Sequence, residues 1–208
     1  AGPPRPRPAG GPRGDQRLSD SAGAARWRLF IAHPVPADVR ADLEQQLRPY
    51  RRAFPAVRWT RPRTWHLTLL FLGSVGPERV PELARLVEDI GALTAPYEAV
   101  VEQGGGRLRR GEGVGWLGLS SGAGALIEAA TIAAERCPAD ITDGPPPKRT
   151  PSAHLTVVRK ADEAAIEALR RQACGAVGVG WRVDRIGLVR SHLTPDGARY
   201  ETLHEATL

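Results

Sequence analysis

Two stretches of the sequence repeat one four-residue pattern that could support acid–base chemistry. Residues 66–69 read His-Leu-Thr-Leu and residues 154–157 read His-Leu-Thr-Val. Both lie in segments rich in β-branched and apolar residues, which predicts two β-strands. Side chains alternate between the faces of a strand, so each histidine should share a face with its threonine, roughly 6.5 Å away. If the two strands border one cleft, they present two imidazoles and two hydroxyls to a ligand.

Two imidazoles on either side of one phosphorus atom suit an in-line displacement. Histidine titrates near pH 6.5, so one ring can be neutral while the other is protonated. The neutral ring would take a proton from the attacking water, and the protonated ring would give one to the departing oxygen. The hydroxyls of Thr68 and Thr156 would donate hydrogen bonds to phosphate oxygens. We therefore predict that His66 and His154 are catalytic, and that a ring phosphodiester suits them because ring strain eases the leaving step.

Alternation along each strand also sorts the residues around the motifs. The residues expected on the core face are Trp65, Leu67, Leu69 and Phe71. Arg159 follows the second histidine by five positions, so it has the opposite parity and should lie on the other face. Two roles for this arginine are about equally supported. It is either a surface residue at the strand end or a contact to phosphate or RNA.

The two motifs stand in matching places of two halves that alternate strands and helices. Besides the motif strands, strands are expected at 27–32, 57–60, 97–102 and 114–119, with a closing hairpin of 181–193 and 198–203. Helices are expected at about 36–54, 80–90, 123–136 and 162–171. The glycine-rich stretch 103–113 is expected to be a mobile basic loop. This pattern predicts an α+β fold with two similar lobes of antiparallel sheet and outer helices around a central cleft.

A third histidine–threonine pair stands in a different context. His192 comes shortly before Pro195-Asp196-Gly197, which is a turn signal. His192 is therefore expected at the surface, outside the site.

Composition separates a tail from a folded body. Residues 1–26 are rich in Pro, Gly and Arg with almost no large apolar side chains, so we expect them to be disordered, with residues 27–208 forming one domain. The net charge of +6 is compatible with a phosphate-bearing partner. No apolar run reaches the roughly 20 residues that span a bilayer, so no membrane association is expected. The cysteines, Cys137 and Cys174, lack metal or redox spacing, which favours a reducing, cytoplasmic setting.

These motifs resemble those of a known family, the two-histidine phosphoesterases. The likeness is strongest to the bacterial and archaeal RNA 2′,3′-cyclic phosphodiesterases, once named 2′-5′ RNA ligases, and it covers residues 27 to about 207. Residues 66–73, ending in Phe-Leu-Gly, are similar to the first family motif. Residues 154–159 match the second motif, including the trailing Arg159.

The resemblance implies a role for each matching residue. His66 would be the proton donor and His154 the proton acceptor, while Thr68 and Thr156 would grip the phosphate beside Arg159 as a further substrate contact. The implied reaction is hydrolysis of a terminal 2′,3′-cyclic phosphate of RNA to a 2′-phosphate, without a metal or cofactor. The implied partner is RNA with such an end, tRNA fragments included, and we expect a monomer.

Three other functions remain open from the sequence. The same chemistry would serve a small cyclic phosphate of a nucleotide or sugar, and its reverse would join RNA ends through a 2′-5′ bond. A non-catalytic RNA-binding module is a different class, which intact histidines and threonines in both motifs disfavour. A zinc site is excluded because two histidines without nearby Cys, Asp or Glu lack a ligand set.

Overall fold

The computed structural model describes residues 25–109, 112–142, 145–149, 152–172, 178–195 and 197–208. The tail prediction for residues 1–24 lies outside them. The strands are β1 (Trp27–Pro34), β2 (Arg58–Trp59), β3 (His66–Val75), β4 (Tyr97–Arg109), β5 (Glu112–Ser121), β6 (Lys148–Arg149), β7 (His154–Ala161), β8 (Val179–Val183), β9 (Arg185–Thr194) and β10 (Gly197–Thr207). The helices are α1 (Ala37–Ala53), α2 (Val80–Leu93), α3 (Ala123–Arg136) and α4 (Glu163–Gln172), with 3₁₀ turns η1 (Pro62–Thr64) and η2 (Pro77–Arg79).

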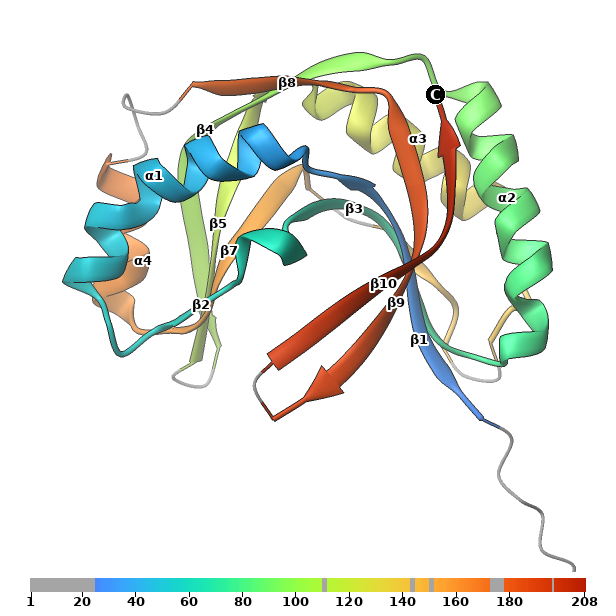
Figure 1. Ribbon diagram of the computed structural model, residues 1–208, viewed down its shortest axis with the longest axis horizontal. Helices are drawn as coiled ribbons and strands as arrows, with labels where there is room; N and C mark the ends of the chain where they lie inside the picture. The colour runs from blue at the N-terminus through green and yellow to red at the C-terminus, as the bar shows by residue number, and fades with distance from the viewer. Residues whose placement is uncertain (1–24, 110–111, 143–144, 150–151, 173–177, 196) are drawn as a thin grey trace, which may run out of the picture.

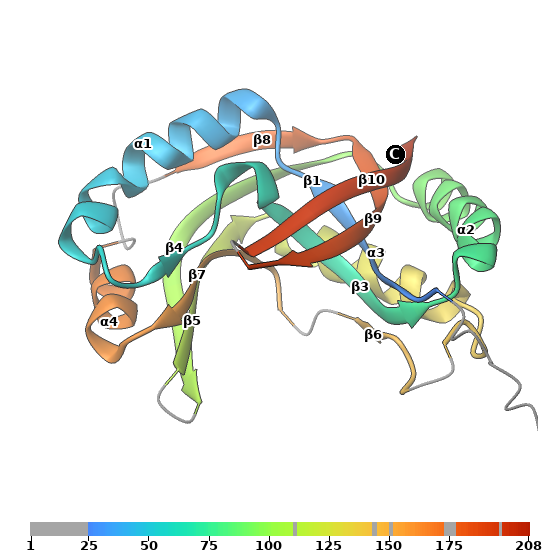
Figure 2. The same ribbon diagram turned by 60° about the horizontal axis from the view of Figure 1, so that its bottom comes forward.

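The described strands join in one curled antiparallel sheet. Its order is β10-β9-β1-β3-β7-β5-β4-β8, with β2 added to β7 and β6 added to β3. Strands β8 and β9 are separated only by Asp184, although they lie toward opposite ends of that order. A flat sheet could not connect them so tightly, so the sheet must bend until its two ends approach each other (Figures 1 and 2).

The sheet has two arms, each covered by two helices on its outer side. Helices α2 and α3 pack on the arm formed by β10, β9, β1 and β3, while α4 packs on β4 and β5 of the other arm. Helix α1 follows β1 in sequence but contacts β8 and α4. This arrangement confirms the predicted α+β fold, although α1, from the first half of the sequence, packs on the arm that contains β8.

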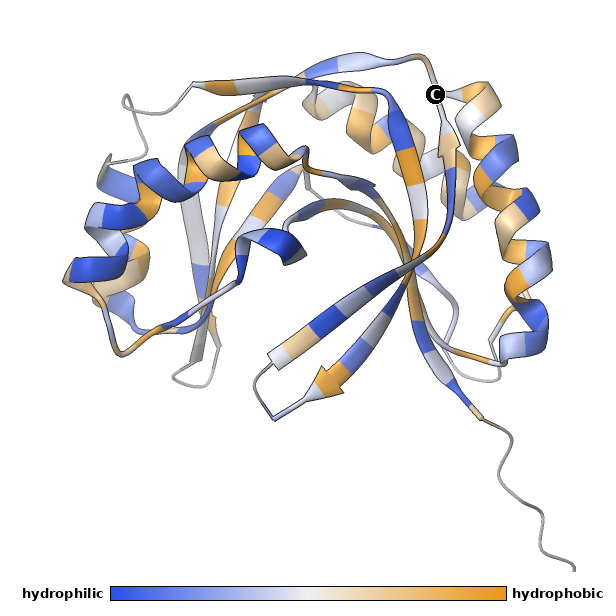
Figure 3. Ribbon diagram, viewed as in Figure 1, coloured by the Kyte–Doolittle hydropathy of each residue, from blue (hydrophilic) through white to orange (hydrophobic). Residues whose placement is uncertain are grey.

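The helices form because their apolar residues recur at helical spacing. Val39, Leu43 and Leu47 are the buried residues of α1, four positions apart, so one stripe of that helix faces the sheet. In α2 the buried residues are Leu83, Leu86, Val87, Ile90 and Gly91. Figure 3 shows hydrophilic and hydrophobic residues on each of these helices, as an amphipathic surface helix requires. No helix among the described residues is long and apolar enough to span a membrane.

Residues 103–109 and 112–113 of the glycine-rich stretch lie in strands, so the prediction of a loop was wrong there. Strand β4 continues to Arg109 and pairs with β5 from Glu112 onward. A Cβ at Gly106 would lie 2.6 Å from the Ile166 side chain of α4. The glycines there make the hairpin thin, so that α4 can pack directly on its backbone.

The predicted closing hairpin was also partly wrong. Residues 185–194 and 197–207 pair as β9 and β10. Trp181, however, belongs to β8, which pairs with β4 at the far edge of the sheet. The predicted strand 181–193 is therefore two strands, β8 and β9. The chain passes from one edge of the curled sheet to the other at Asp184.

His33, at the end of β1, should make the folded state sensitive to acid. Its side chain is 0% exposed, its Nδ1 lies 2.6 Å from the Arg185 carbonyl, and burial lowers its pKa to about 4. Below pH 6.5 the unfolded chain takes up a proton that the folded chain refuses until about pH 4, so stability falls as the pH decreases through this window. The contribution is roughly 3 kcal/mol between pH 7 and pH 4.

Urea unfolding of wild type and His33→Gln at several pH values measures this term. The variant should start less stable and lose less stability on acidification. Identical pH slopes would contradict the prediction, because His66 and every other group titrate in both proteins.

Candidate active site

The two repeated motifs lie side by side at the centre of the sheet. Strands β3 and β7 run antiparallel, with Leu67 paired to Leu155. Both leucines are 0% exposed, so each motif is anchored in the core by its central residue. In this register each histidine stands opposite the threonine of the other motif, roughly 5 Å away, and the two histidines are diagonal neighbours at about 7–8 Å.

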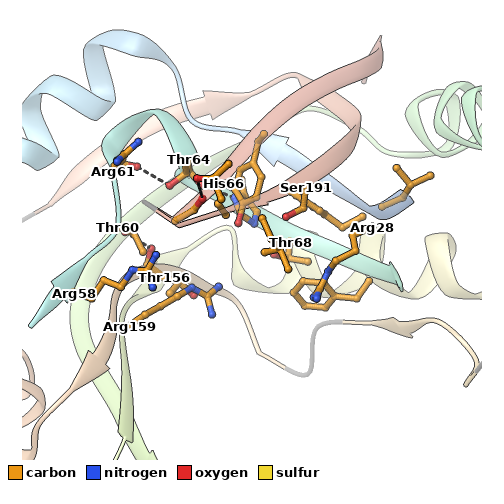
Figure 4. Close-up of a pocket in the computed structure, with 18 of the residues that line it drawn as sticks. Arg28, Arg58, Thr60, Arg61, Thr64, His66, Thr68, Thr156, Arg159 and Ser191 are labelled. Carbon is orange, nitrogen blue, oxygen red and sulfur yellow. Dashed lines mark hydrogen bonds between the residues drawn. The ribbon is translucent and has the colours of Figure 1, made fainter. Parts of the chain in front are cut away.

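One cleft of about 660 Å³ collects the residues singled out from the sequence (Figure 4). Its lining includes His66, Thr68, His154, Thr156 and Arg159. A cleft of this size suits a small ligand or the end of a longer one. The sequence placed these residues on two strands only, and the antiparallel pairing of β3 with β7 is what brings them together.

Both histidines have the same tautomer for the same reason. Nδ1 of His66 lies 2.7 Å from the Thr64 carbonyl, and Nδ1 of His154 lies 2.9 Å from the Ser152 carbonyl. A carbonyl oxygen only accepts, so Nδ1 carries the hydrogen in each ring. Nε2 is then left as the nitrogen that can exchange a proton with a ligand in the cleft.

The two rings differ in their surroundings. His66 packs between the rings of Phe30 and Tyr200. Its ring centroid lies 4.8 Å from that of Phe30 and 5.3 Å from that of Tyr200. The rings of Phe30 and Tyr200 also contact each other. His154 contacts Trp116, with centroids 5.5 Å apart. We call Phe30 and Tyr200 the aromatic clamp of His66.

The aromatic clamp contributes to a strong pKa shift. Burial lowers the pKa of His66 to about 4, against the bond to the Thr64 carbonyl, which raises it. The nearby charges of Arg159 and His154 lower it further. His66 is therefore neutral at pH 7 in the free protein.

A bulge in β3 corrects the expected place of Phe71. Successive residues Ile31 and Ala32 of β1 pair with Leu70 and Thr68, so one residue of β3 is extra. An extra residue reverses the alternation beyond it. Phe71 is consequently 50% exposed and lines the cleft, and the prediction that it faces the core was wrong. Trp65, before the bulge, is buried as predicted.

The second motif ends in the same way. Gly115 and Trp116 of β5 pair with Val158 and Thr156, so β7 also contains one extra residue, three positions after its histidine. The bulge turns Arg159 onto the cleft face. The parity argument that separated Arg159 from His154 was therefore wrong, and Phe71 and Arg159 occupy equivalent positions of the two motifs.

Three further arginines of the cleft were missed. Arg28 comes from β1, Arg58 from β2 and Arg61 from the segment before η1. None of the described residues that line the cleft is acidic, so the cleft favours anions. Arg28 shares strand parity with Phe30, which was a usable signal, but nothing in the local sequence around Arg58 and Arg61 indicated the cleft.

Two other residues with polar side chains, His192 and Arg107, lie outside the cleft. His192 is on β9, where its Nε2 is 2.8 Å from Glu201, and it is a surface residue as expected. Arg107 is exposed on β4 and does not line the cleft. Within the described part of the chain, no group of three or more His, Cys, Asp and Glu side chains could hold a metal ion.

Comparisons with known proteins agree with this geometry. A family profile described as LigT like Phosphoesterase matches residues 34–105. The chain is 31% identical over 193 residues to the RNA 2′,3′-cyclic phosphodiesterase of Thermus thermophilus, covering 87% of this chain and 90% of that protein. A protein of the same name from Archaeoglobus fulgidus is 29% identical over 180 residues, covering 85% and 97%.

A solved structure shares the architecture. The crystal structure of E. coli LigT complexed with 3′-AMP superimposes with a TM-score of 0.68 at 24% identity, covering 88% of this chain and 99% of that chain. At this identity the likeness concerns the fold. The curled two-arm sheet is thus a known arrangement.

Proposed function

The chain belongs to the LigT-like phosphoesterase family, and on this basis we propose that it hydrolyses the 2′,3′-cyclic phosphate ends of RNA to 2′-phosphomonoesters. The relatives named above are RNA 2′,3′-cyclic phosphodiesterases. The observation that carries the proposal is the meeting of both motifs in one cleft, with the tautomer of each histidine set by a backbone carbonyl. Four arginines and no described acidic residue line that cleft, which suits a polyanion.

The reaction needs one proton acceptor and one proton donor on opposite sides of the phosphorus. His154 Nε2 takes a proton from water while the water oxygen bonds to phosphorus. The bond from phosphorus to the 3′ oxygen breaks, and that oxygen takes a proton from His66 Nε2. The phosphoryl group stays on the 2′ oxygen. Each proton transfer contributes about 10²–10⁴-fold to the rate.

The remaining residues hold the substrate. Thr68 and Thr156 donate hydrogen bonds to the non-bridging oxygens, and Arg159 supplies a positive charge where negative charge gathers. Phe71, the equivalent of Arg159 in the other motif, offers an exposed aromatic face. A nucleobase can stack on such a face whatever its identity, so this residue suits a nucleotide better than a sugar phosphate.

The donor role of His66 requires a change of protonation on binding. Its pKa of about 4 makes it neutral in the free protein. A phosphate anion placed against the ring favours the charged imidazole and raises that pKa. We therefore infer that substrate binding, rather than the free protein, protonates His66.

We further propose that tRNA fragments with cyclic ends are among the natural substrates, and that the enzyme is monomeric and cytoplasmic. The support is the RNA in the names of the relatives and the lone cysteines of the sequence.

Product analysis tests the function directly. A short RNA ending in a 2′,3′-cyclic phosphate is incubated with the protein in EDTA, and the product is identified by chromatography and phosphorus NMR. We expect a single product with the phosphate on the 2′ oxygen. A 3′-phosphate would show that the leaving oxygen is not the proposed one, and no turnover at all would refute the function.

A further inference from the structure

Two arginines of the cleft face each other across neighbouring strands. Arg58 of β2 and Arg159 of β7 are paired residues in that ladder. Both side chains are exposed and both line the cleft. Like charges directly opposite each other across strands are destabilising, and neither guanidinium has a hydrogen bond or ion pair to another described residue. The pair therefore lacks a compensating anion within the described protein.

The position of this pair relates it to the second catalytic motif. Arg159 stands three residues after Thr156 on the same strand, on the same face because of the bulge. Figure 4 shows Arg58, Arg159 and Thr156 together on one side of the cleft, with Arg28 and Ser191 on the other. Any phosphate held by Thr156 would thus have two guanidiniums close by.

The terminal hairpin leaves room for the second guanidinium. A Cβ built on Gly197 would lie 2.8 Å from Nη2 of Arg58, and Gly197 has a φ of +118°. A larger residue would be strained at that φ and would displace the guanidinium. The tip of the β9–β10 hairpin thus passes close to Arg58 across the cleft.

We propose that Arg58 and Arg159 together form a site for a doubly charged phosphate, with Arg58 as a second phosphate-binding residue. This inference rests on the proposed function. The cyclic diester carries one negative charge. When His154 removes the proton of the attacking water, the five-coordinate phosphorus group carries two, and the phosphomonoester product also carries close to two above about pH 6. One arginine balances the single negative charge of the substrate. Two arginines balance the two negative charges that are present as the reaction proceeds.

Two ligands that differ in charge and by a single methyl group test the site. The first is 3′-deoxyadenosine 2′-phosphate, a dianion at pH 8, and the second is its methyl ester, a monoanion. Neither has the 3′ hydroxyl needed to form a ring, so neither is converted. Calorimetry at pH 8 compares the affinities of the wild type, Arg58→Ala, Arg58→Lys and Arg28→Ala. Arg28 is the matched control because it is also a cleft arginine but lies on the other side.

The expected result is a selective loss. Arg58→Ala should weaken dianion binding by about 10- to 100-fold, the range of a charge-assisted hydrogen bond. It should weaken monoanion binding by no more than a few fold, and Arg58→Lys should recover part of the loss. Arg28→Ala should affect both ligands equally.

Turnover of a 2′,3′-cyclic mononucleotide completes the test. In Arg58→Ala, kcat should fall by about tenfold or more with little change in KM, because the second charge appears only after the substrate is bound. Equal losses for the two ligands, or no loss for either, would overturn the proposal. An effect confined to longer RNA would also overturn it by assigning Arg58 to a different phosphate of the strand. Absence of turnover in the wild type would refute the proposed function instead, while the charge comparison would still stand on its own.

Discussion

Replacing His66 or His154 with alanine should lower kcat on RNA ending in a 2′,3′-cyclic phosphate by about 10²–10⁴-fold for each variant. Both rings lie in the cleft with Nε2 available, and neither belongs to the leucine-anchored core face. The loss should therefore appear in turnover while thermal unfolding changes little. The double variant should lose much less than the product of the two single losses, since the rings act on one reaction. His192→Ala is the matched control and should retain wild-type kcat.

The choice of leaving group distinguishes the two roles. In catechol cyclic phosphate the leaving oxygen is phenolic. A phenolic oxygen needs a proton donor less than the alcohol oxygen of ribose does. His66→Ala should therefore lose much less activity on catechol cyclic phosphate than on a cyclic nucleotide, whereas His154→Ala should lose similar activity on both. If His154→Ala instead lost less activity on catechol cyclic phosphate, His154 would be the proton donor and His66 the proton acceptor. Full activity of either variant on cyclic-phosphate RNA would remove the mechanism.

Replacing Tyr200 with alanine should move the alkaline side of the kcat/KM profile toward higher pH, because His66 is the proton donor and must be protonated to act. The aromatic clamp buries His66, and this burial is the main reason that its pKa is about 4. Since kcat/KM reports ionisations of the free enzyme, kcat/KM of the wild type should decrease as the pH rises above about 4, where His66 loses its proton. Without the tyrosine ring, water reaches the imidazole and its pKa moves toward 6.5. The decline of kcat/KM in the variant should then begin about one pH unit or more above that of the wild type.

Tyr200→Phe is the control for this shift. It keeps the ring that excludes water, so its alkaline limb should coincide with that of the wild type. NMR titration of the His66 ring in both variants measures the same pKa without turnover. Arg159 and His154, which also act on His66, are unchanged in both variants. An unshifted limb in Tyr200→Ala would show that the tyrosine does not control this ionisation.

The sequence by itself determined most of the strands and helices and the four motif side chains that line the cleft. The alternation of His66 and Thr68 with Leu67 is local, because successive side chains of a strand point to opposite faces whatever lies around them. The same holds for the helices, whose apolar spacing alone decides which stripe is buried. Two copies of one motif in two halves were therefore enough to predict the fold class and the four central side chains.

Only the tertiary structure decided which other residues join them. A bulge arises when the neighbouring strand skips a residue, so the exposure of Phe71 and the inward position of Arg159 depend on pairing with β1 and β5. Arg58 reaches the cleft because β2 pairs with β7, about a hundred residues later in the sequence. The glycines of β4 predict a loop when read locally, because their packing partner, α4, lies far along the chain. Pairing between distant segments leaves no periodic signal in either segment, and for that reason the alternation rule failed one residue beyond each motif.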